Sequence, residues 1–226
     1  ISTGNPGYRV TREQAFRHAE STLDPTSPVA RVLARIYNNS RIDTRYFCVP
    51  DMGAENVALA SSPPEGPSTD RYGEVADVFD DIIEASMGVG SGPVVGGEER
   101  IEMFYPTDGS FRVSTSRRFE RYAECALPLA TEVAKRAMSD VGVRPSDIGR
   151  VVVVTSTGVC GPGLDGDLVR SIGLNHSVER EVVSFQGCGA GINGLRLASQ
   201  YVVTHPGRLA LLISVELPSL HMHKVR

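Results

Sequence analysis

The segment EVVSFQGCGAGINGLRLASQY, residues 181–201, decides the fold of this chain. It predicts a short apolar strand at 182–185, which runs through a Gly-Cys-Gly turn into a helix from about 191 to 204. A strand that passes directly into a helix is typical of the β–α–β unit from which parallel sheets are built. Cys188 therefore lies where a helix N-terminus meets the end of a sheet strand.

The residues on either side repeat the same alternation. Unbroken apolar runs predict further strands at 151–154 and 209–215. Between the first two strands, a Gly-rich loop at 158–166 leads into a short helix at 167–172. Continuous apolar strands separated by helices indicate a parallel sheet that is buried on both faces. We therefore predict an α/β fold.

Two helical patterns precede this region. Residues 27–37 have apolar side chains at helical spacing, with Ser27-Pro28 as the expected cap and first turn. A second helix is expected from Thr115 until Gly142, with a kink or restart at Pro128. Its apolar face is expected to comprise Phe119, Tyr122, Ala126, Ala130, Val133 and Ala137.

The stretch between the two helices has a different composition. The segment from about residue 51 to about residue 110 is rich in Gly, Pro, Ser and acidic side chains, which predicts a surface insertion. Within it, the pattern of residues 75–84 indicates a short amphipathic helix. The glycines at 88–97 lack the Lys-Ser/Thr pair of a phosphate-binding loop, so we predict no phosphate site there.

Composition excludes several classes of protein. The chain has 226 residues, of which 41% are hydrophobic and 22% charged, as in ordinary globular proteins. Its net charge of −4 lacks the basic excess of nucleic-acid-binding proteins, so we expect no nucleic acid partner. No apolar run reaches the roughly 18 residues of a membrane span. The first residue is Ile1, which indicates that the natural start, with any targeting segment, lies upstream.

Cysteine usage points to a reducing compartment. The four cysteines are widely spaced and form no CxxC pair, so we expect free thiols and a cytoplasmic location. Cys125 is expected to be a core residue, Cys160 is expected to have a structural role, and Cys48 has no activating neighbour in the sequence. His221 and His223 form an HxH pair without a nearby third ligand, so we predict no metal site.

Cys188 is the residue best placed for chemistry. A helix N-terminus carries unpaired N–H groups and a partial positive charge, which favour the nucleophilic thiolate over the thiol. Gly187, Gly189 and Gly191 would let a substrate approach the sulfur and leave N–H groups free to face a developing oxyanion. The alternative is a buried cysteine that fills a tight turn. The glycines on both sides favour the nucleophile.

Five blocks of sequence resemble, in order and spacing, those of the type III polyketide synthases, the chalcone synthase and alkylpyrone synthase group of the thiolase fold. They are NPGYRVTREQ at 5–14, RIYNNSRIDTRY at 35–46, TSTGVCGPGLDGDLVRSIGL at 155–174, FQGCGAGINGLRLA at 185–198 and LLISVELPSL at 211–220. The resemblance implies that residues 1–226 form the N-terminal half of a thiolase-like fold, which has αβαβα layers when complete, with an insertion at about 51–110. The C-terminal half, which carries the family's catalytic His and Asn, is not present in these residues.

The resemblance also implies a function. Cys188 would accept an acyl group from a starter acyl-CoA and condense it with malonyl-CoA after decarboxylation, giving a pyrone, resorcinol or phloroglucinol type of polyketide. The substrates are CoA thioesters, and neither a cofactor nor a metal is implied. The family also implies a homodimer.

Further site residues come from the resemblance alone. Arg35 matches a basic contact to the CoA phosphates, although Val32 and Asn39 replace other basic positions of the family. Ser156 and Thr157 match the loop that borders the substrate cavity. Gly161 matches a position at the family's dimer interface. Pro218 and His221 match the starter pocket, where plant enzymes have hydroxyl residues. Glu216 matches a carboxylate that the family usually keeps buried and hydrogen-bonded.

Two other functions remain open at this stage. An initiating ketoacyl-acyl-carrier-protein synthase shares the cysteine nucleophile and the decarboxylative condensation but uses malonyl groups bound to a carrier protein. A non-catalytic structural half that requires a partner chain would explain the missing His and Asn. The residues GINGLRLA after Cys188 and the SRIxxR block favour the polyketide synthase over the ketoacyl synthase.

Overall fold

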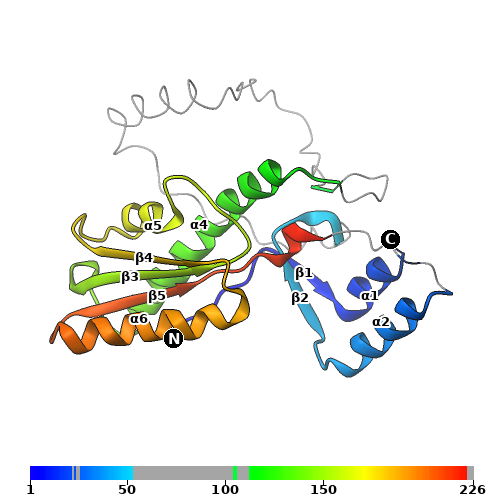
Figure 1. Ribbon diagram of the computed structural model, residues 1–226, viewed down its shortest axis with the longest axis horizontal. Helices are drawn as coiled ribbons and strands as arrows, with labels where there is room; N and C mark the ends of the chain where they lie inside the picture. Colours follow the sequence, from blue (N-terminus) through cyan, green and yellow to red (C-terminus); the bar gives the residue numbers. More distant parts are fainter. Residues whose placement is uncertain (22, 24–25, 53–103, 106–111, 223–226) are drawn as a thin grey trace, which may run out of the picture. The chain divides into compact units, whose positions relative to one another are not determined.

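The structure is a computed structural model that describes residues 1–21, 23, 26–52, 104–105 and 112–222 (Figure 1). These residues belong to one compact unit of the chain, which Ile1–Val57 and Met103–Arg226 form. The amphipathic helix that we expected over 75–84 lies outside the described residues. No helix in the described part of the chain is long and apolar enough to cross a membrane.

A parallel sheet forms the centre of the unit. Its strands are β3 (Ile148–Thr155), β4 (Glu179–Ser184) and β5 (Leu209–Ser214), and β3 lies between the other two. Val153 pairs with Val182 on one side and with Ile213 on the other. The four valines at 151–154 are all buried, because helices cover both faces of this strand. The predicted α/β fold is confirmed, and each predicted strand overlaps an observed one.

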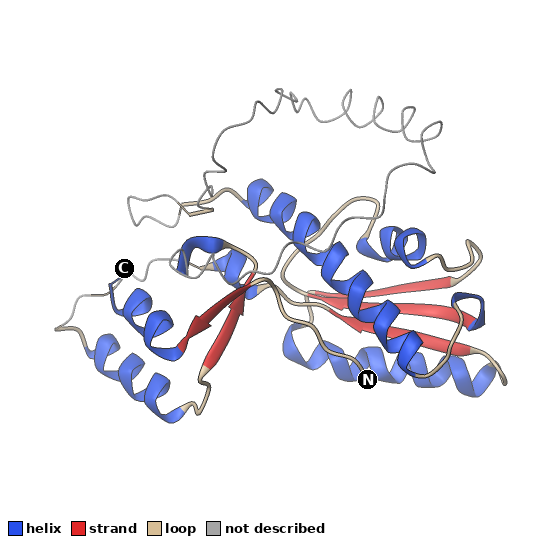
Figure 2. Cartoon of the chain, turned by 180° about the vertical axis from the view of Figure 1, so that it is seen from behind, coloured by secondary structure: helices blue, strands red, loops and turns tan. Residues whose placement is uncertain are grey.

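The helices divide between the two faces of the sheet (Figure 2). On one face, α4 (Thr115–Asp140) and α5 (Leu164–Ile172) pack against Val151 and Val153. On the other, α6 (Ala190–Thr204) packs against Val152 and Val154. A Cβ atom on Gly194 of α6 would lie 2.7 Å from Val154 Cγ2, so only glycine allows α6 to lie this close to the sheet.

The long helix α4 begins after Ser114, whose Oγ accepts a hydrogen bond from Arg117 N and caps the helix. The helix differs from its prediction in two respects, the effect of Pro128 and the buried face. It continues through Pro128 without a restart. Phe119, Val133 and Ala137 are only partly buried. The buried positions instead recur every four residues, as Arg118, Tyr122, Ala126, Ala130, Ala134 and Met138.

The N-terminal residues form a small layer of their own. Strand β1 (Tyr8–Thr11) pairs antiparallel with β2 (Thr44–Phe47), and α1 (Arg12–Ser21) packs against α2 (Pro28–Asn39). The predicted cap of α2 is confirmed, since Ser27 Oγ accepts a hydrogen bond from Ala30 N. Short 3-10 helices occur at η1 (Pro50–Met52), η4 (Pro145–Asp147), η5 (Gly187–Gly189) and η6 (Pro218–His221).

Candidate active site

The carboxyl ends of the three parallel strands meet at one edge of the sheet. Ser156 and Thr157 follow β3, Cys188 follows β4, and Glu216 follows β5. Strand β4 pairs with one side of β3 and strand β5 with the other, so the connections leave β3 in opposite directions. The carboxyl end of β3 is therefore a topological switch point. Open parallel sheets bind ligands at such points. The fold therefore brings Ser156, Thr157, Cys188 and Glu216 to one end of the sheet from three separate loops.

A sharply turned backbone presents Cys188. Phe185 has a φ of 56° and Gly187 a φ of 66°, both in the left-handed region, so the chain reverses between β4 and α6. The structure corrects our prediction for Phe185, which lies in this turn and not in the strand, with its side chain 64% exposed. Cys188 itself is exposed and lies in η5, with Gly189 between it and Ala190, the first residue of α6. Asn193 Nδ2 donates to Gln186 Oε1 at 2.7 Å, which holds the turn against the helix.

Glu216 joins the loops that follow β3 and β5. Its carboxylate accepts hydrogen bonds from Ser156 N at 2.8 Å and from the Thr157 hydroxyl at 2.7 Å. Thr157 Oγ1 in turn accepts one from Leu217 N at 2.8 Å. Glu216 is exposed in this chain, although the resemblance implied a buried carboxylate; its hydrogen bonds are as expected. Ser156 Oγ is buried and has no hydrogen-bond partner among the described residues.

His221 is part of the same connection. Its Nε2 lies 2.6 Å from the carbonyl oxygen of Thr157, so this nitrogen carries the proton and donates. His223, the other half of the HxH pair, lies outside the described residues. Among the described residues no group of three His, Cys, Asp or Glu side chains could hold a metal ion.

Two positioning residues were not predicted from the sequence. Arg118 is only 5% exposed, and its guanidinium donates to the carbonyl oxygen of Leu220 in η6. The Tyr105 hydroxyl donates to the carbonyl oxygen of Ser219 at 2.7 Å. The burial of Arg118 could have been predicted from its position four residues before Tyr122 on the same face of α4. It was missed because the buried face of a helix is identified from apolar residues.

An apolar hollow of about 1140 Å³ opens beside the cysteine. Cys188, Glu216 and Pro218 line it, together with apolar side chains of α4, β5 and α6. Ser156, Thr157 and His221 are not among its lining residues; Ser156 and Thr157 are hydrogen-bonded to Glu216, which lines it, and His221 is hydrogen-bonded to Thr157. Arg35 is exposed on α2, which packs against α1, and does not line the hollow.

The other cysteines differ from one another. Cys160 is partly buried, and burial raises the pKa of its thiol. Cys125 packs at the edge of the main core, in agreement with its expected place. Cys48 corrects our prediction, because groups distant in the sequence lower the pKa of its thiol to about 7. The hydrogen bond from the Cys125 side chain is the largest cause, and Ser219 and Arg121 add to it.

The comparisons with known proteins agree with this fold. Residues 104–224 match the model for the N-terminal domain of chalcone and stilbene synthases. The alpha-pyrone synthesis polyketide synthase-like protein Pks18 of Mycobacterium tuberculosis is 34% identical over 222 residues, which are 98% of this chain and 44% of Pks18. The crystal structure of PKS-I from the brown alga Ectocarpus siliculosus superposes with a TM-score of 0.74 at 36% identity, over 99% of this chain and 48% of that one.

The chain therefore belongs to the chalcone and stilbene synthase family of type III polyketide synthases and has their thiolase-like α/β fold. A bacterial type III polyketide synthase, the 1,3,6,8-tetrahydroxynaphthalene synthase of Streptomyces coelicolor, shares the fold at 18% identity with a TM-score of 0.66. The chain spans less than half the length of Pks18 and of the algal protein.

Proposed function

We propose that the protein is a condensing acyltransferase that builds a polyketide on Cys188 from a starter acyl-CoA and malonyl-CoA. The observation that carries the proposal is the placement of Cys188, exposed on a strained turn at the start of α6 and open to an apolar hollow. An accessible thiol at a helix N-terminus is the arrangement of an activated nucleophile. Family membership supports the same chemistry.

The reaction has two stages on the same sulfur. Cys188 Sγ attacks the carbonyl carbon of the starter thioester, and the CoA thiolate leaves. Malonyl-CoA then loses CO₂, and the resulting carbanion attacks the acyl-Cys188 carbonyl, which forms the carbon–carbon bond and releases the Cys188 thiolate. Splitting the synthesis into loading and condensation replaces one difficult step by two easier ones.

The surroundings of Cys188 suggest how each stage is supported. The N-terminus of α6 lies next to Cys188 and has no side-chain cap, so its partial positive charge would stabilise an oxyanion on the acyl carbonyl. Ser156 Oγ offers a buried hydroxyl without a partner among the described residues. From the family resemblance we infer that Pro218 and His221 of η6 shape the starter side of the site and that Arg35 of α2 contacts the CoA phosphates.

The apolar hollow favours an aliphatic starter. Its walls at Leu129, Val133 and Leu211 are hydrocarbon, and an acyl chain attached to Cys188 would bury apolar surface against them. Polar side chains such as Asn5 and Ser219 also line the hollow, but apolar side chains form most of its walls.

These residues constitute the N-terminal half of the working enzyme, with about 51–110 as an insertion. Asp51 accepts hydrogen bonds from Phe104 N and Tyr105 N, which brings the two flanks of the insertion together. The outer face of α6 exposes Ile192 (71%), Leu195 (58%) and Val203 (74%). A helix this apolar on both faces belongs inside a larger protein, so we propose that a C-terminal half covers it and that the complete protein forms a homodimer.

The test is the intact mass of the full-length protein after incubation with a series of acyl-CoA thioesters, followed by peptide mapping. We expect an acyl adduct on Cys188 that increases with chain length and is absent from Cys188→Ala. No adduct with any thioester would favour a structural half. If malonyl-CoA extends the adduct without any carrier protein, the protein is a polyketide synthase. Extension only with a carrier protein would favour the ketoacyl synthase.

A further inference from the structure

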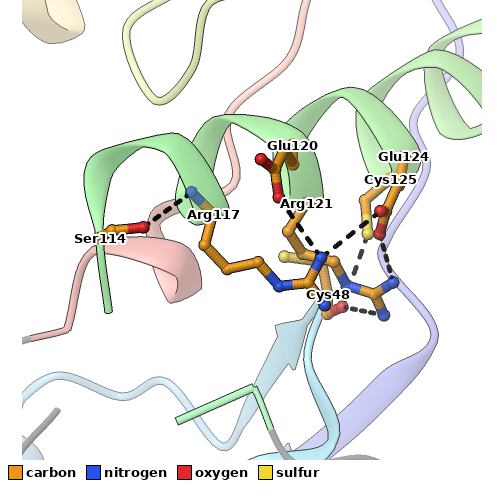
Figure 3. A network of polar contacts seen from close by, with 7 residues as sticks. All are labelled: Cys48, Ser114, Arg117, Glu120, Arg121, Glu124 and Cys125. Carbon is orange, nitrogen blue, oxygen red and sulfur yellow. Dashed lines mark hydrogen bonds and ion pairs between the residues drawn. The ribbon is translucent and has the colours of Figure 1, made fainter. Parts of the chain in front are cut away.

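Two cysteines far apart in the sequence lie side by side beneath α4. Cys48 follows β2 and is 4% exposed, and Cys125 projects from α4 and is partly buried. The Cys125 thiol donates to the carbonyl oxygen of Cys48 at 3.6 Å (Figure 3). The two side chains are close enough that the Cys125 thiol has the largest single influence on the ionisation of Cys48. Two neighbouring thiols are the reactants of a disulfide.

The charges around the pair differentiate the two thiols. Arg121 of α4 donates to the carbonyl oxygen of Cys48 at 3.4 Å and forms an ion pair with Glu124 at 2.8 Å (Figure 3). Together with the Cys125 and Ser219 side chains, Arg121 lowers the pKa of Cys48, against the opposing effect of burial. The pKa of Cys125 is raised, first by its hydrogen bond with Cys48 and then by burial. Cys48 is therefore the thiol of the pair that ionises more readily, and the thiolate is the form that attacks an oxidant.

The pair is also connected to the candidate active site. Cys48 Sγ lies 3.1 Å from Ser219 Oγ, and Cys48 N donates to the same hydroxyl at 3.2 Å. Ser219 belongs to η6 and lines the hollow that contains Cys188 and Pro218. A disulfide would direct Cys48 Sγ toward Cys125 and remove its contact with Ser219. One anchor of η6 would be lost.

We propose that Cys48 and Cys125 are a reversible oxidation site whose disulfide removes the contact between Cys48 Sγ and Ser219 and so loosens η6 at the edge of the hollow. Its oxidant is hydrogen peroxide. The Cys48 thiolate attacks one peroxide oxygen, which gives Cys48 sulfenic acid and, after protonation of the leaving hydroxide, one water. The Cys125 sulfur then attacks the sulfenic sulfur, and the sulfenic oxygen leaves as a second water. Two thiols lose two protons and two electrons, and one peroxide is reduced to two waters.

The covalent test uses hydrogen peroxide on the full-length protein. Remaining thiols are alkylated, the protein is digested, and the peptides are identified by mass. We expect the peptides of Cys48 and Cys125 to be joined, with two hydrogens fewer than their sum, and separated again by dithiothreitol. In Cys125→Ser, dimedone should instead trap a sulfenic acid on Cys48. The matched control Cys160→Ser should form the cross-link as the unchanged protein does.

The structural consequence is read by hydrogen exchange, which does not depend on the proposed enzymatic activity. Cross-linking should accelerate exchange at the Cys48 amide and in the peptide that covers η6, and Cys125→Ser treated in the same way should show neither change. Two alkylated, unoxidised thiols at a peroxide dose that oxidises Cys188 would overturn the site. A cross-link that leaves exchange in η6 unchanged would overturn its link to the hollow.

Discussion

The thiol of Cys188 and the thiols of Cys48 and Cys125 occupy opposite kinds of surroundings. Cys188 is exposed, and its position comes from local backbone, namely the turn through Phe185 and Gly187 and the start of α6. Cys48 is buried, and its surroundings come from α4 and η6, which lie far away in the sequence. The first arrangement suits a thiol that must receive a large acyl group, and the second a thiol that meets only its neighbour or a small oxidant.

The comparison shows that access of a substrate to a thiol and ionisation of a thiol depend on different parts of the structure. A helix N-terminus and an open approach prepare Cys188 for a bulky substrate, whereas hydrogen bonds and a nearby guanidinium stabilise a thiolate on Cys48 that a CoA thioester cannot reach. Ser219 connects the two regions, because it touches Cys48 and lines the hollow beside Cys188. The following changes test how independent the two regions are.

Replacing Cys188 should have the largest effect. Cys188→Ala removes the nucleophile, so we expect acyl loading to fall by at least about 1,000-fold. The peroxide cross-link between Cys48 and Cys125 should be retained, as measured by peptide mass. Cys48→Ser is the matched control, since it should retain acyl loading and lose the cross-link. Loading by Cys188→Ala at the original rate would assign the acyl group to another cysteine.

Gly158→Ala should destabilise the part of the unit where the two regions meet. The added Cβ would lie 2.0 Å from Cγ of Tyr122, whose hydroxyl is hydrogen-bonded to Thr155 Oγ1 at 2.6 Å. Because Tyr122 is fully buried on α4, its ring cannot move away to relieve the steric clash. We expect a loss of about 3 kcal/mol in the free energy of unfolding. Urea denaturation measures it. Gly7→Ala, whose methyl group meets open space, should change stability by less than about 1 kcal/mol.

The reaction of Cys48 with peroxide should depend on pH. The thiolate is the reactive form, and a pKa of about 7 means that its fraction rises with pH through neutrality, below the ordinary thiol pKa of 9.0. The Cys125 thiol and Arg121 of α4 lower the pKa of Cys48, and Glu124 of α4 acts on Cys125. We expect the rate of cross-linking to rise about tenfold between pH 6 and pH 8 and then to level off. A rate that keeps rising to pH 9 would mean that Cys48 reacts as an ordinary thiol.

The smallest effect is expected for Glu216→Gln. The amide keeps one acceptor oxygen but loses the charge that strengthens the bonds from Ser156 N and the Thr157 hydroxyl. Since Glu216 is exposed, we expect a loss of about 1 kcal/mol in the free energy of unfolding, measured by urea denaturation. Exchange at the Ser156 amide should accelerate while exchange at Cys48 stays unchanged. Acceleration at both amides would mean that the two regions move together.

The sequence predicted the features that depend on local pattern. Strands β3 and β5, helix α6 and the turn at Cys188 follow from apolar runs and glycines, which act within a few residues. The end of β4 was missed by one residue, because the left-handed conformation of Phe185 breaks the preference of an aromatic side chain for strands. The N-cap Ser27 was found because capping is also local.

Features that depend on distant contacts could not be predicted. The thiol of Cys48 is activated by residues of α4 and by Ser219 near the other end of the described chain, and no pattern around position 48 indicates them. Arg118 was missed because the buried face of a helix is recognised by apolar residues, whereas this arginine is buried through its hydrogen bonds to carbonyl groups. Pro128 did not interrupt α4, because packing against the sheet outweighs a local propensity.

The central position of β3 has a consequence for synthesis on the ribosome. Val153 hydrogen-bonds in register with strands that contain Val182 and Ile213, and both strands are translated after it. A nascent chain grows at about 5–20 residues per second, so the valines of β3 stay unpaired for several seconds. Unpaired apolar strands of this kind bind chaperones or associate with other chains. Slow translation after β3 should therefore lower the yield of native protein more than slow translation after β5.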